Sequence, residues 1–216
     1  GCVLSTSINK YCYISIHPYF NENQTLLKYS ENELVDNPDQ INHKIFRRVL
    51  TDMDIHGVEI SSTADIPGGT GLGSSSTFTV GLLNTLNCYK GKFVSKDKLA
   101  KLACEVEIEK LGNPIGKQDQ YGAALGGLNF IKFNQDGSVS HEPILMDGKT
   151  YKRLQNNLLM FYTGTTRSAN TILAEQTKNI TSEDKAKNLL KMCGLAKDMK
   201  VALENNDISS FGKILD

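Results

Sequence analysis

The first part of the chain shows the hydrophobic and polar patterns of several strands and one helix. β-branched and aromatic residues crowd the segment from Ile8 to Ile16, which predicts one or two strands. Residues 24–29 predict a further strand, and residues 57–63 alternate apolar and polar side chains as a half-buried strand does. Between them, an Asn-Pro helix-start signal precedes apolar residues at helical spacing, so we expect an amphipathic helix over residues 38–50.

The middle of the chain predicts two helices. Phe78, Leu82 and Leu86 recur at helical spacing, and the other faces of this helix are also apolar. We therefore expect the helix to be buried on most sides. A second helix is expected to begin at Ser95 and to end before the Gly-Asn-Pro sequence at residues 112–114.

The remainder of the chain predicts a β-hairpin followed mostly by helices. Residues 127–133 and 138–146 have hairpin patterns around a Gln-Asp-Gly turn, and the apolar run at residues 157–163 predicts another strand. Helical stripes follow at residues 169–173 and 189–196. Because strands precede a helix-rich tail, the pattern favours an α+β fold, with a domain boundary near residues 150–156.

Composition narrows the functional classes. The chain has 216 residues with 24 basic and 24 acidic side chains, and this balance argues against a dedicated nucleic-acid-binding protein. No apolar run approaches the roughly 18 residues that a membrane-spanning helix needs, so no membrane partner is expected. A secretory signal pattern is absent from the N-terminal residues. The five cysteines lack metal-site or CxxC spacing, so we expect free thiols and a cytoplasmic protein.

Residues 64–76 form the most unusual stretch, ADIPGGTGLGSSS, and lead directly into the helix that carries Phe78. Glycines let the backbone adopt positive φ angles and approach a ligand closely. Unpaired N–H groups at a helix start attract anions, phosphate above all, and serine hydroxyls there can bond phosphate or ligate Mg²⁺. We therefore predict a phosphate-binding loop, against the alternative of a loop that only caps the helix. Its residues are Pro67, Gly68, Gly69, Thr70, Gly71, Leu72, Gly73, Ser74, Ser75 and Ser76.

Two common phosphate-binding motifs do not fit this loop. A Walker A motif needs Lys after its last glycine, where this chain has Ser74. A Rossmann motif needs a third glycine at that same position. The preceding strand also carries alternating polar residues, unlike a parallel strand covered on both faces.

Carboxylates that follow the loop in sequence are candidates for metal binding and proton transfer. Glu105, Glu107 and Glu109 lie on the second predicted helix, and periodicity does not decide whether Glu107 lines a crevice or all three are solvated. Asp119 follows Lys117 on an expected turn, where it could act as a general base or form an ordinary Asx turn. One carboxylate and a serine hydroxyl, together with substrate phosphates, match the ligands that Mg²⁺ prefers.

The glycine-rich loop resembles the second motif of the GHMP kinases, a family that includes galactokinase, homoserine kinase and mevalonate kinase. That motif runs Pro, three residues and then Gly-Leu-Gly-Ser-Ser. The matching residues are Pro67, Gly71, Leu72, Gly73, Ser74 and Ser75. Ser76 departs from the alanine that most members carry. The resemblance implies a two-domain α+β fold and the ATP-dependent phosphorylation of a small-molecule hydroxyl group.

The segment from Glu107 to Asp119 resembles the family's carboxylate region, in which a glutamate precedes a Gly-x-x-Asp-Gln element. Carried over to this chain, Glu107 would ligate Mg²⁺ together with Ser75, and Ser74 is the other candidate ligand. Asp119 would accept the proton of the substrate hydroxyl. Lys117 would either lower the pKa of Asp119 or point to solvent.

Four blocks along the chain resemble the sugar-1-kinase branch that acts on D-glycero-D-manno-heptose 7-phosphate. The blocks are STSINKYCYI, GLGSSSTFTVGLLN, GKQDQYGAALGGLNF and YTGTTRSANTIL. This resemblance implies phosphorylation of the anomeric C1 hydroxyl, on the way to nucleotide-activated heptose for surface polysaccharide. A fucokinase-like or galactokinase-like enzyme and a noncatalytic ligand-binding relative remain as alternatives.

Candidate substrate-binding residues lie in the first and last of these blocks. Gly164 and Arg167 lie between a predicted strand and a predicted helix, where a second anion site would suit a 7-phosphate. Lys10 and Tyr11 are similar to the corresponding residues of the branch, which makes them further candidates.

Domain bounds also follow from the resemblance. Residues 1–153 would form the N-terminal, ATP-binding domain without its first strand, and residues 154–216 would begin an incomplete C-terminal domain. The family's opening motif and its late glycine-rich motif are absent, the chain has no initiator methionine, and it stops within an apolar-periodic segment. These observations predict an internal piece of a longer protein.

Overall fold

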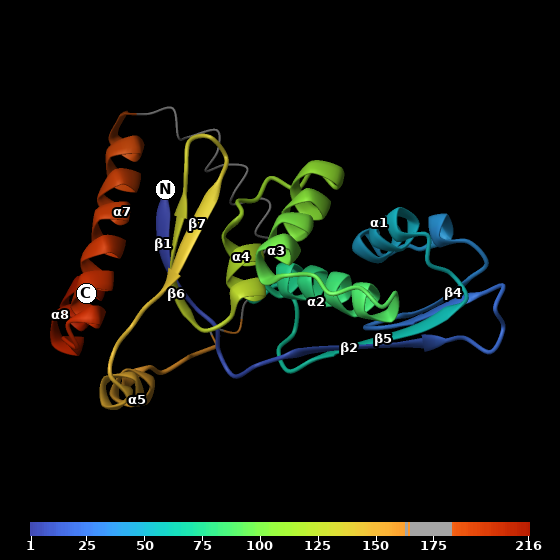
Figure 1. The fold of residues 1–216 in the computed structure, drawn as a ribbon, viewed down its shortest axis with the longest axis horizontal. Coiled ribbons are helices and arrows are strands. Elements are labelled where there is room, and N and C mark those ends of the chain that lie inside the picture. Colours follow the sequence, from blue (N-terminus) through green and yellow to red (C-terminus); the bar gives the residue numbers. More distant parts are fainter. Residues whose placement is uncertain (163, 165–182) are drawn as a thin grey trace. The chain divides into compact units, whose positions relative to one another are not determined.

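The computed structural model describes residues 1–162, 164 and 183–216, which form two compact units (Figure 1). One unit spans Asn9–Leu125, and the other joins Gly1–Ile8 to the described residues from Gly126 onward. Each unit has its own sheet and its own helices. This arrangement confirms the predicted α+β class.

The unit Asn9–Leu125 contains the predicted phosphate loop. Its strands are β2 (Cys12–Pro18), β3 (Thr25–Lys28), β4 (Asn32–Val35) and β5 (Val58–Ala64). Its α-helices are α1 (Lys44–Met53), α2 (Ser74–Tyr89), α3 (Lys96–Cys104) and α4 (Gln118–Leu125). A 3₁₀ turn, η1 (Pro38–Gln40), precedes α1, and a π-helical segment, η2 (Glu105–Lys110), continues α3.

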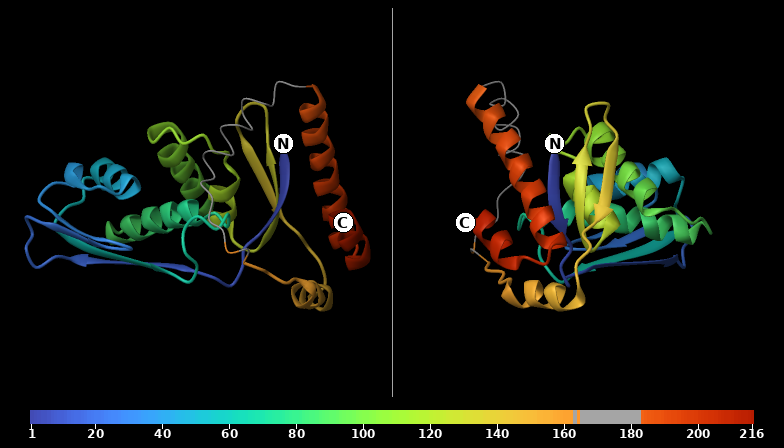
Figure 2. Two further views of the ribbon diagram at one scale, coloured as in Figure 1. Left: turned by 180° about the vertical axis from the view of Figure 1, so that it is seen from behind. Right: turned by 60° about the vertical axis from the view of Figure 1, so that its left-hand side comes forward.

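The sheet of this unit is mixed, with the strand order β2-β5-β3-β4. β5 pairs antiparallel with β2 and parallel with β3, and β3 and β4 form an antiparallel pair. Helix α2 lies along β2 in the views of Figures 1 and 2. Gly81 allows this close approach, because a Cβ atom on Gly81 would lie 3.2 Å from Cδ1 of Ile14. The sheet therefore positions the first turn of α2, where the glycine-rich loop ends.

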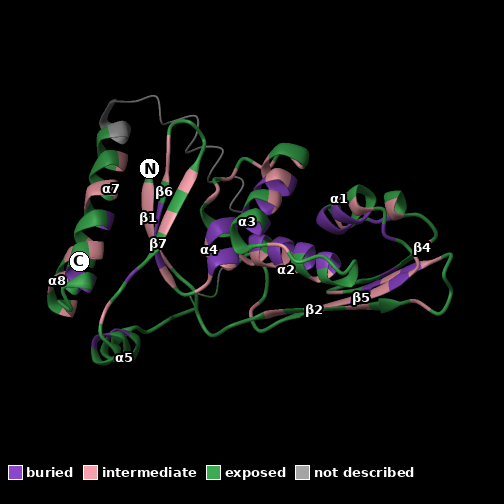
Figure 3. Cartoon of the chain, in the orientation of Figure 1, coloured by how far each residue is buried: buried purple, intermediate pink, exposed green. Residues whose placement is uncertain are grey.

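Buried side chains from α1, α2 and the sheet form the core of this unit (Figure 3). Leu27 and Ile60 of the sheet, Phe46 of α1 and Leu82 of α2 are each 0% exposed. The rings of Phe46 and Phe78 meet edge to face, with centroids 4.9 Å apart, a geometry that aromatic pairs favour. The apolar residues that predicted these two helices are thus the residues that hold them on the sheet.

A buried carboxylate anchors the start of α1. Glu33 of β4 is 7% exposed and accepts hydrogen bonds from the Tyr29 hydroxyl at 2.7 Å and from the backbone N–H groups of Asn42 and His43 at 2.6 and 3.2 Å. Burial alone would raise the pKa of Glu33, but these donated bonds outweigh it and hold the pKa below its ordinary value. The ionised carboxylate therefore stabilises the helix start.

The second unit is built around a three-stranded antiparallel sheet of order β1-β6-β7. Its strands are β1 (Cys2–Thr6), β6 (Leu128–Phe133) and β7 (Val139–Pro143), and its helices are α5 (Gly148–Asn157), α7 (Glu183–Glu204) and α8 (Ile208–Leu215). Phe130 of β6, Leu154 of α5, Leu203 of α7 and Phe211 of α8 belong to one buried cluster. The N-terminal strand β1, through Leu4, and the C-terminal helices α7 and α8 thus share one core.

Most predicted strands are confirmed, including the hairpin of β6 and β7. The helix expected over residues 38–50 is partly wrong, because Asn37 caps only η1 and the α-helix begins at Lys44 with His43 as its N-cap. β4 was not predicted from the sequence.

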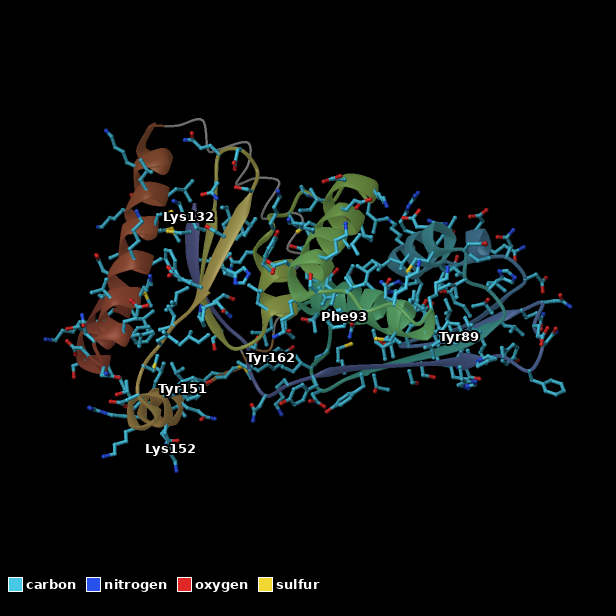
Figure 4. The ribbon with its side chains drawn as sticks, in the orientation of Figure 1. Tyr89, Phe93, Lys132, Tyr151, Lys152 and Tyr162 are labelled. Atoms are coloured by element: carbon cyan, nitrogen blue, oxygen red, sulfur yellow. The ribbon has the colours of Figure 1, made fainter. Side chains whose placement is uncertain are left out.

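The strand predicted at residues 157–163 is wrong within the described residues. α5 runs to Asn157, and residues 158–162 form no regular element and are exposed, Tyr162 included (Figure 4). A short apolar run does not by itself establish a strand. The helical stripe at 169–173 lies outside the described residues, whereas that at 189–196 lies on α7. The expected boundary between residues 153 and 154 falls inside α5, and the domain bounds 1–153 and 154–216 remain a prediction.

Within the described part of the chain, no helix has both the length and the apolar character to cross a membrane.

The pKa of Glu33 generates a stability prediction. Because the folded pKa lies below that of the unfolded chain, about 4.3, this stabilisation is present above that value and is lost as pH falls through the folded pKa. We expect Glu33→Gln to lower the free energy of unfolding at pH 7 by about 1–3 kcal/mol and to flatten its decline in acid. Denaturant titrations at several pH values measure both effects. Glu31→Gln, at an exposed position of the same hairpin, is the control, and equal behaviour of the two variants would contradict the prediction.

Candidate functional site

The glycine-rich loop has the backbone geometry that its sequence predicts. Gly69, Gly71 and Gly73 have φ angles of 77°, 77° and 69°, in the region that L side chains rarely adopt. Gly73 is the N-cap of α2 and supplies no side-chain hydrogen bond to the helix start. The first backbone bond of the helix runs from the Thr77 N–H to the Gly73 carbonyl, at 2.9 Å. The preceding N–H groups of the first turn have no partner within the helix, which is the feature of helix starts that bind anions.

A hydrogen-bonded line of side chains runs inward from this helix start. The Ser75 hydroxyl, on an exposed residue, donates to Oε1 of Glu107 at 2.5 Å. The other carboxylate oxygen, Oε2, accepts a hydrogen bond from the amide of Gln120 at 2.8 Å. Glu107 and Gln120 are both 0% exposed. Hydrogen bonds thus connect the two predicted metal ligands, Ser75 of α2 and Glu107 of η2. They extend from Glu107 to Gln120 of α4.

Of the three neighbouring glutamates, Glu107 is the fully buried one. It follows the buried Leu99 and Ala103 at helical spacing. The segment that carries it is a π turn, in which Leu111 donates its N–H to the carbonyl of Val106, five residues earlier, at 3.0 Å. Glu105 instead forms an ion pair with Lys110, and Glu109 is exposed. Single π turns occur frequently at functional sites, but the apolar stripe of the sequence does not reveal one.

Asp119 lies in the first turn of α4, so the expectation that it lies on a turn was wrong. A Cβ atom on Gly73 would lie 3.4 Å from Cβ and Cγ of Asp119. The carboxyl group of Asp119 therefore lies against the backbone at the N-cap of α2, and the missing side chain of Gly73 provides its space. α4 also packs against α2. The predicted base is thus adjacent to the predicted phosphate loop.

Partial desolvation raises the pKa of Asp119 above its ordinary value, although the residue as a whole is exposed. The charge of Lys117 acts on Cys104, whose pKa burial raises to about 11 and Lys117 partly lowers. The two roles considered for Lys117 beside Asp119 stay predictions. A raised pKa makes the Asp119 carboxylate a stronger proton acceptor than a solvated aspartate.

Of the predicted substrate residues, Tyr11 and Lys10 lie in the unit that contains the loop. The Tyr11 N–H donates to the Asp65 carboxylate at 2.9 Å, and the Asp65 N–H donates to the Tyr11 carbonyl at 2.9 Å, so Tyr11 lies where β5 leads into the loop. Lys10 is its exposed neighbour. Gly164, with a φ angle of 77°, belongs to the other unit. Arg167 lies outside the described residues.

The donor set of Ser75 and Glu107 fits Mg²⁺ held jointly with a phosphorylated ligand. The described residues contain no group of three or more His, Cys, Asp or Glu side chains that could hold a metal. One carboxylate and one hydroxyl therefore require phosphate or water oxygens to complete a coordination shell, which is the usual arrangement for Mg²⁺. Sequence reasoning did not assign a role to Gln120, although this residue directly follows Asp119 in the motif.

Comparisons with known proteins agree with this geometry. Residues 40–127 match the GHMP kinases N terminal domain, which spans the loop, Ser75, Glu107 and Asp119. The chain therefore contains a GHMP kinase N-terminal domain.

Individual relatives are sugar kinases. The D-glycero-alpha-D-manno-heptose 7-phosphate kinase of Campylobacter jejuni is 30% identical over 195 residues, which cover 87% of this chain and 57% of that protein. The L-fucokinase/L-fucose-1-P guanylyltransferase of Bacteroides fragilis is 30% identical over 165 residues, which cover 74% of this chain and 17% of that protein. The chain thus spans little more than half the length of the Campylobacter relative.

Solved structures share the fold. The D-glycero-D-manno-heptose 1-phosphate kinase of Bacteroides thetaiotaomicron has a TM-score of 0.82 and 26% identity, covering 100% of this chain and 68% of that one. The Lactococcus lactis galactokinase, complexed with galactose, has a TM-score of 0.68 at 16% identity, covering 100% of this chain and 67% of that one. This second similarity concerns the fold alone.

The positive φ of Gly73 generates a prediction. Gly73→Ala introduces a side chain at a φ of 69°, so the free energy of unfolding is expected to fall by about 1–2 kcal/mol. Gly68→Ala, in the same loop but at a glycine without a positive φ, is the control and should change it little. Thermal or denaturant unfolding measures the difference, and equal stability of both variants would contradict the left-handed backbone at Gly73.

Proposed function

We propose that the protein containing this chain is an ATP-dependent sugar kinase whose substrate is D-glycero-D-manno-heptose 7-phosphate, phosphorylated at the anomeric C1 hydroxyl. The observation that carries the proposal is the hydrogen-bonded pair of Ser75 and Glu107 at the start of α2, with Asp119 against the same helix start. Phosphoryl transfer needs an anion site, a divalent-cation site and a group that orients the acceptor hydroxyl. These residues provide one of each.

The N–H groups at the start of α2 bind phosphate oxygens of ATP, and the glycines of the loop let the backbone approach them. Ser75 and Glu107 hold Mg²⁺ beside these phosphates. When bound there, Mg²⁺ supplies charge neutralisation at the phosphate oxygens. Catalysis then depends mainly on how the chain positions the two substrates.

Asp119 orients the acceptor hydroxyl and receives its proton. The hydroxyl oxygen forms a bond to the γ-phosphorus, the bond between that phosphorus and the β–γ bridging oxygen breaks, and ADP leaves. The hydroxyl proton passes to the Asp119 carboxylate, whose raised pKa favours this transfer. Lys117, two residues earlier, is proposed to assist electrostatically.

The choice of sugar rests on similarity to individual relatives. Similarity to two heptose phosphate kinases supports a heptose phosphate, and we propose that Arg167 and Gly164 bind its 7-phosphate, with Lys10 and Tyr11 contributing to the sugar site. The equal identity to a fucokinase favours L-fucose as the second candidate substrate. The proposal places the protein in the cytoplasm, where ATP and sugar phosphates are available.

An ATP-consumption assay with a panel of sugars tests this proposal. We expect ADP release with D-glycero-D-manno-heptose 7-phosphate and little with L-fucose or D-galactose. Asp119→Asn is expected to lower kcat by about 10²–10⁴-fold, the usual contribution of a positioned base, while nucleotide binding persists.

Asp198→Asn, at an exposed position of α7, is the matched control and should retain activity. If the protein phosphorylates only fucose, the proposed substrate is wrong and the proposed reaction class stands. Absence of turnover with every sugar, or full activity of Asp119→Asn, would contradict the proposed reaction and favour a noncatalytic relative.

A further inference from the structure

Gln120 is a fully buried amide that contacts the carboxylate of the proposed cation site. It is 0% exposed, lies on α4 next to Asp119, and donates from Nε2 to Oε2 of Glu107 at 2.8 Å. Only the NH₂ side of an amide can donate to a carboxylate, so the chemistry of the contact fixes the orientation of the Gln120 side chain. A buried carboxylate oxygen without such a donor would be costly.

This bond divides the roles of the two Glu107 oxygens. Oε2 faces the protein interior and is engaged by Gln120, whereas Oε1 is shared with the exposed Ser75 at the start of α2. Glu107 therefore presents one oxygen, together with the Ser75 hydroxyl, toward the glycine-rich loop. A carboxylate held through one oxygen suits Mg²⁺, which keeps several phosphate and water ligands.

The other end of the Gln120 amide shows that this arrangement has a cost. Among the described residues, no hydrogen-bond partner reaches Oε1 of Gln120, although this atom is buried. An unsatisfied buried acceptor destabilises a fold. An apolar side chain of similar size would avoid that cost. The favourable interaction that a glutamine makes here is its hydrogen bond to Glu107.

We propose that Gln120 is a positioning residue that holds the Glu107 carboxylate in the orientation that binds a divalent cation with the nucleotide phosphates. The inference rests on the proposed function, because it assumes that Ser75 and Glu107 hold this cation. It concerns cation affinity rather than proton transfer, and so it is separate from the role of Asp119.

The test measures how the binding of a nonhydrolysable ATP analogue to the complete protein depends on Mg²⁺. Gln120→Met keeps the size of the side chain and removes the donor. Groups that orient metal ligands typically contribute 10–100-fold in metal affinity, so this variant should need about 10–100-fold more Mg²⁺ for half-maximal binding. Binding of the metal-free analogue should be unchanged. Gln118→Met, exposed on the same helix, is the control and should match the wild type.

A second measurement avoids any dependence on how the variant folds. In the wild-type protein with the analogue bound, the side-chain amide resonance of Gln120 should shift saturably as Mg²⁺ is added. An unchanged Mg²⁺ requirement in folded Gln120→Met, or an amide resonance that does not respond to Mg²⁺, overturns the inference. If wild-type protein shows no Mg²⁺-dependent binding of the analogue, the proposed function itself fails, which separates the two outcomes.

Discussion

The burial of the Glu107 carboxylate is the constraint on which the site depends. A charged group withdrawn from water must be paired through hydrogen bonds, or its burial would oppose folding. Glu107 meets this requirement through Ser75 on one side and Gln120 on the other. Three helical segments that are separate in sequence are thereby fixed around a single charge. The same bonds that satisfy the carboxylate orient it toward the glycine-rich loop.

Backbone features of the chain place this charge where it can act. Glu107 of η2 is buried, whereas its neighbour Glu105 is half-buried and Glu109 is exposed. Gly73 ends the loop with a positive φ and leaves space for Asp119, and Gly81 lets α2 approach β2 closely. The start of α2, the proposed cation ligands Ser75 and Glu107, and the proposed proton acceptor Asp119 therefore come together within one compact unit.

Local sequence signals predicted the loop and most strands, because glycine spacing and apolar alternation act over a few residues. The positive φ angles of the loop glycines follow directly from this type of signal. Other features depend on contacts between distant segments. The anchoring role of Glu33 requires β4 to lie beside the start of α1, and the bond from Gln120 requires α4 to meet η2. No spacing in the sequence encodes these two contacts. The choice of Glu107 over its neighbours came from the resemblance to the family's carboxylate region, because periodicity alone left it open.

The binding of Mn²⁺, a spectroscopic substitute for Mg²⁺, tests the central claim most directly. Electron paramagnetic resonance can count bound Mn²⁺ in the complete protein with an ATP analogue present, for the wild type and for Glu107→Gln. The account predicts that the variant loses more than about tenfold in Mn²⁺ affinity, whereas Glu109→Gln, at an exposed position of the same segment, retains it. Equal Mn²⁺ affinity in the wild type and Glu107→Gln would show that the buried carboxylate is not part of a cation site.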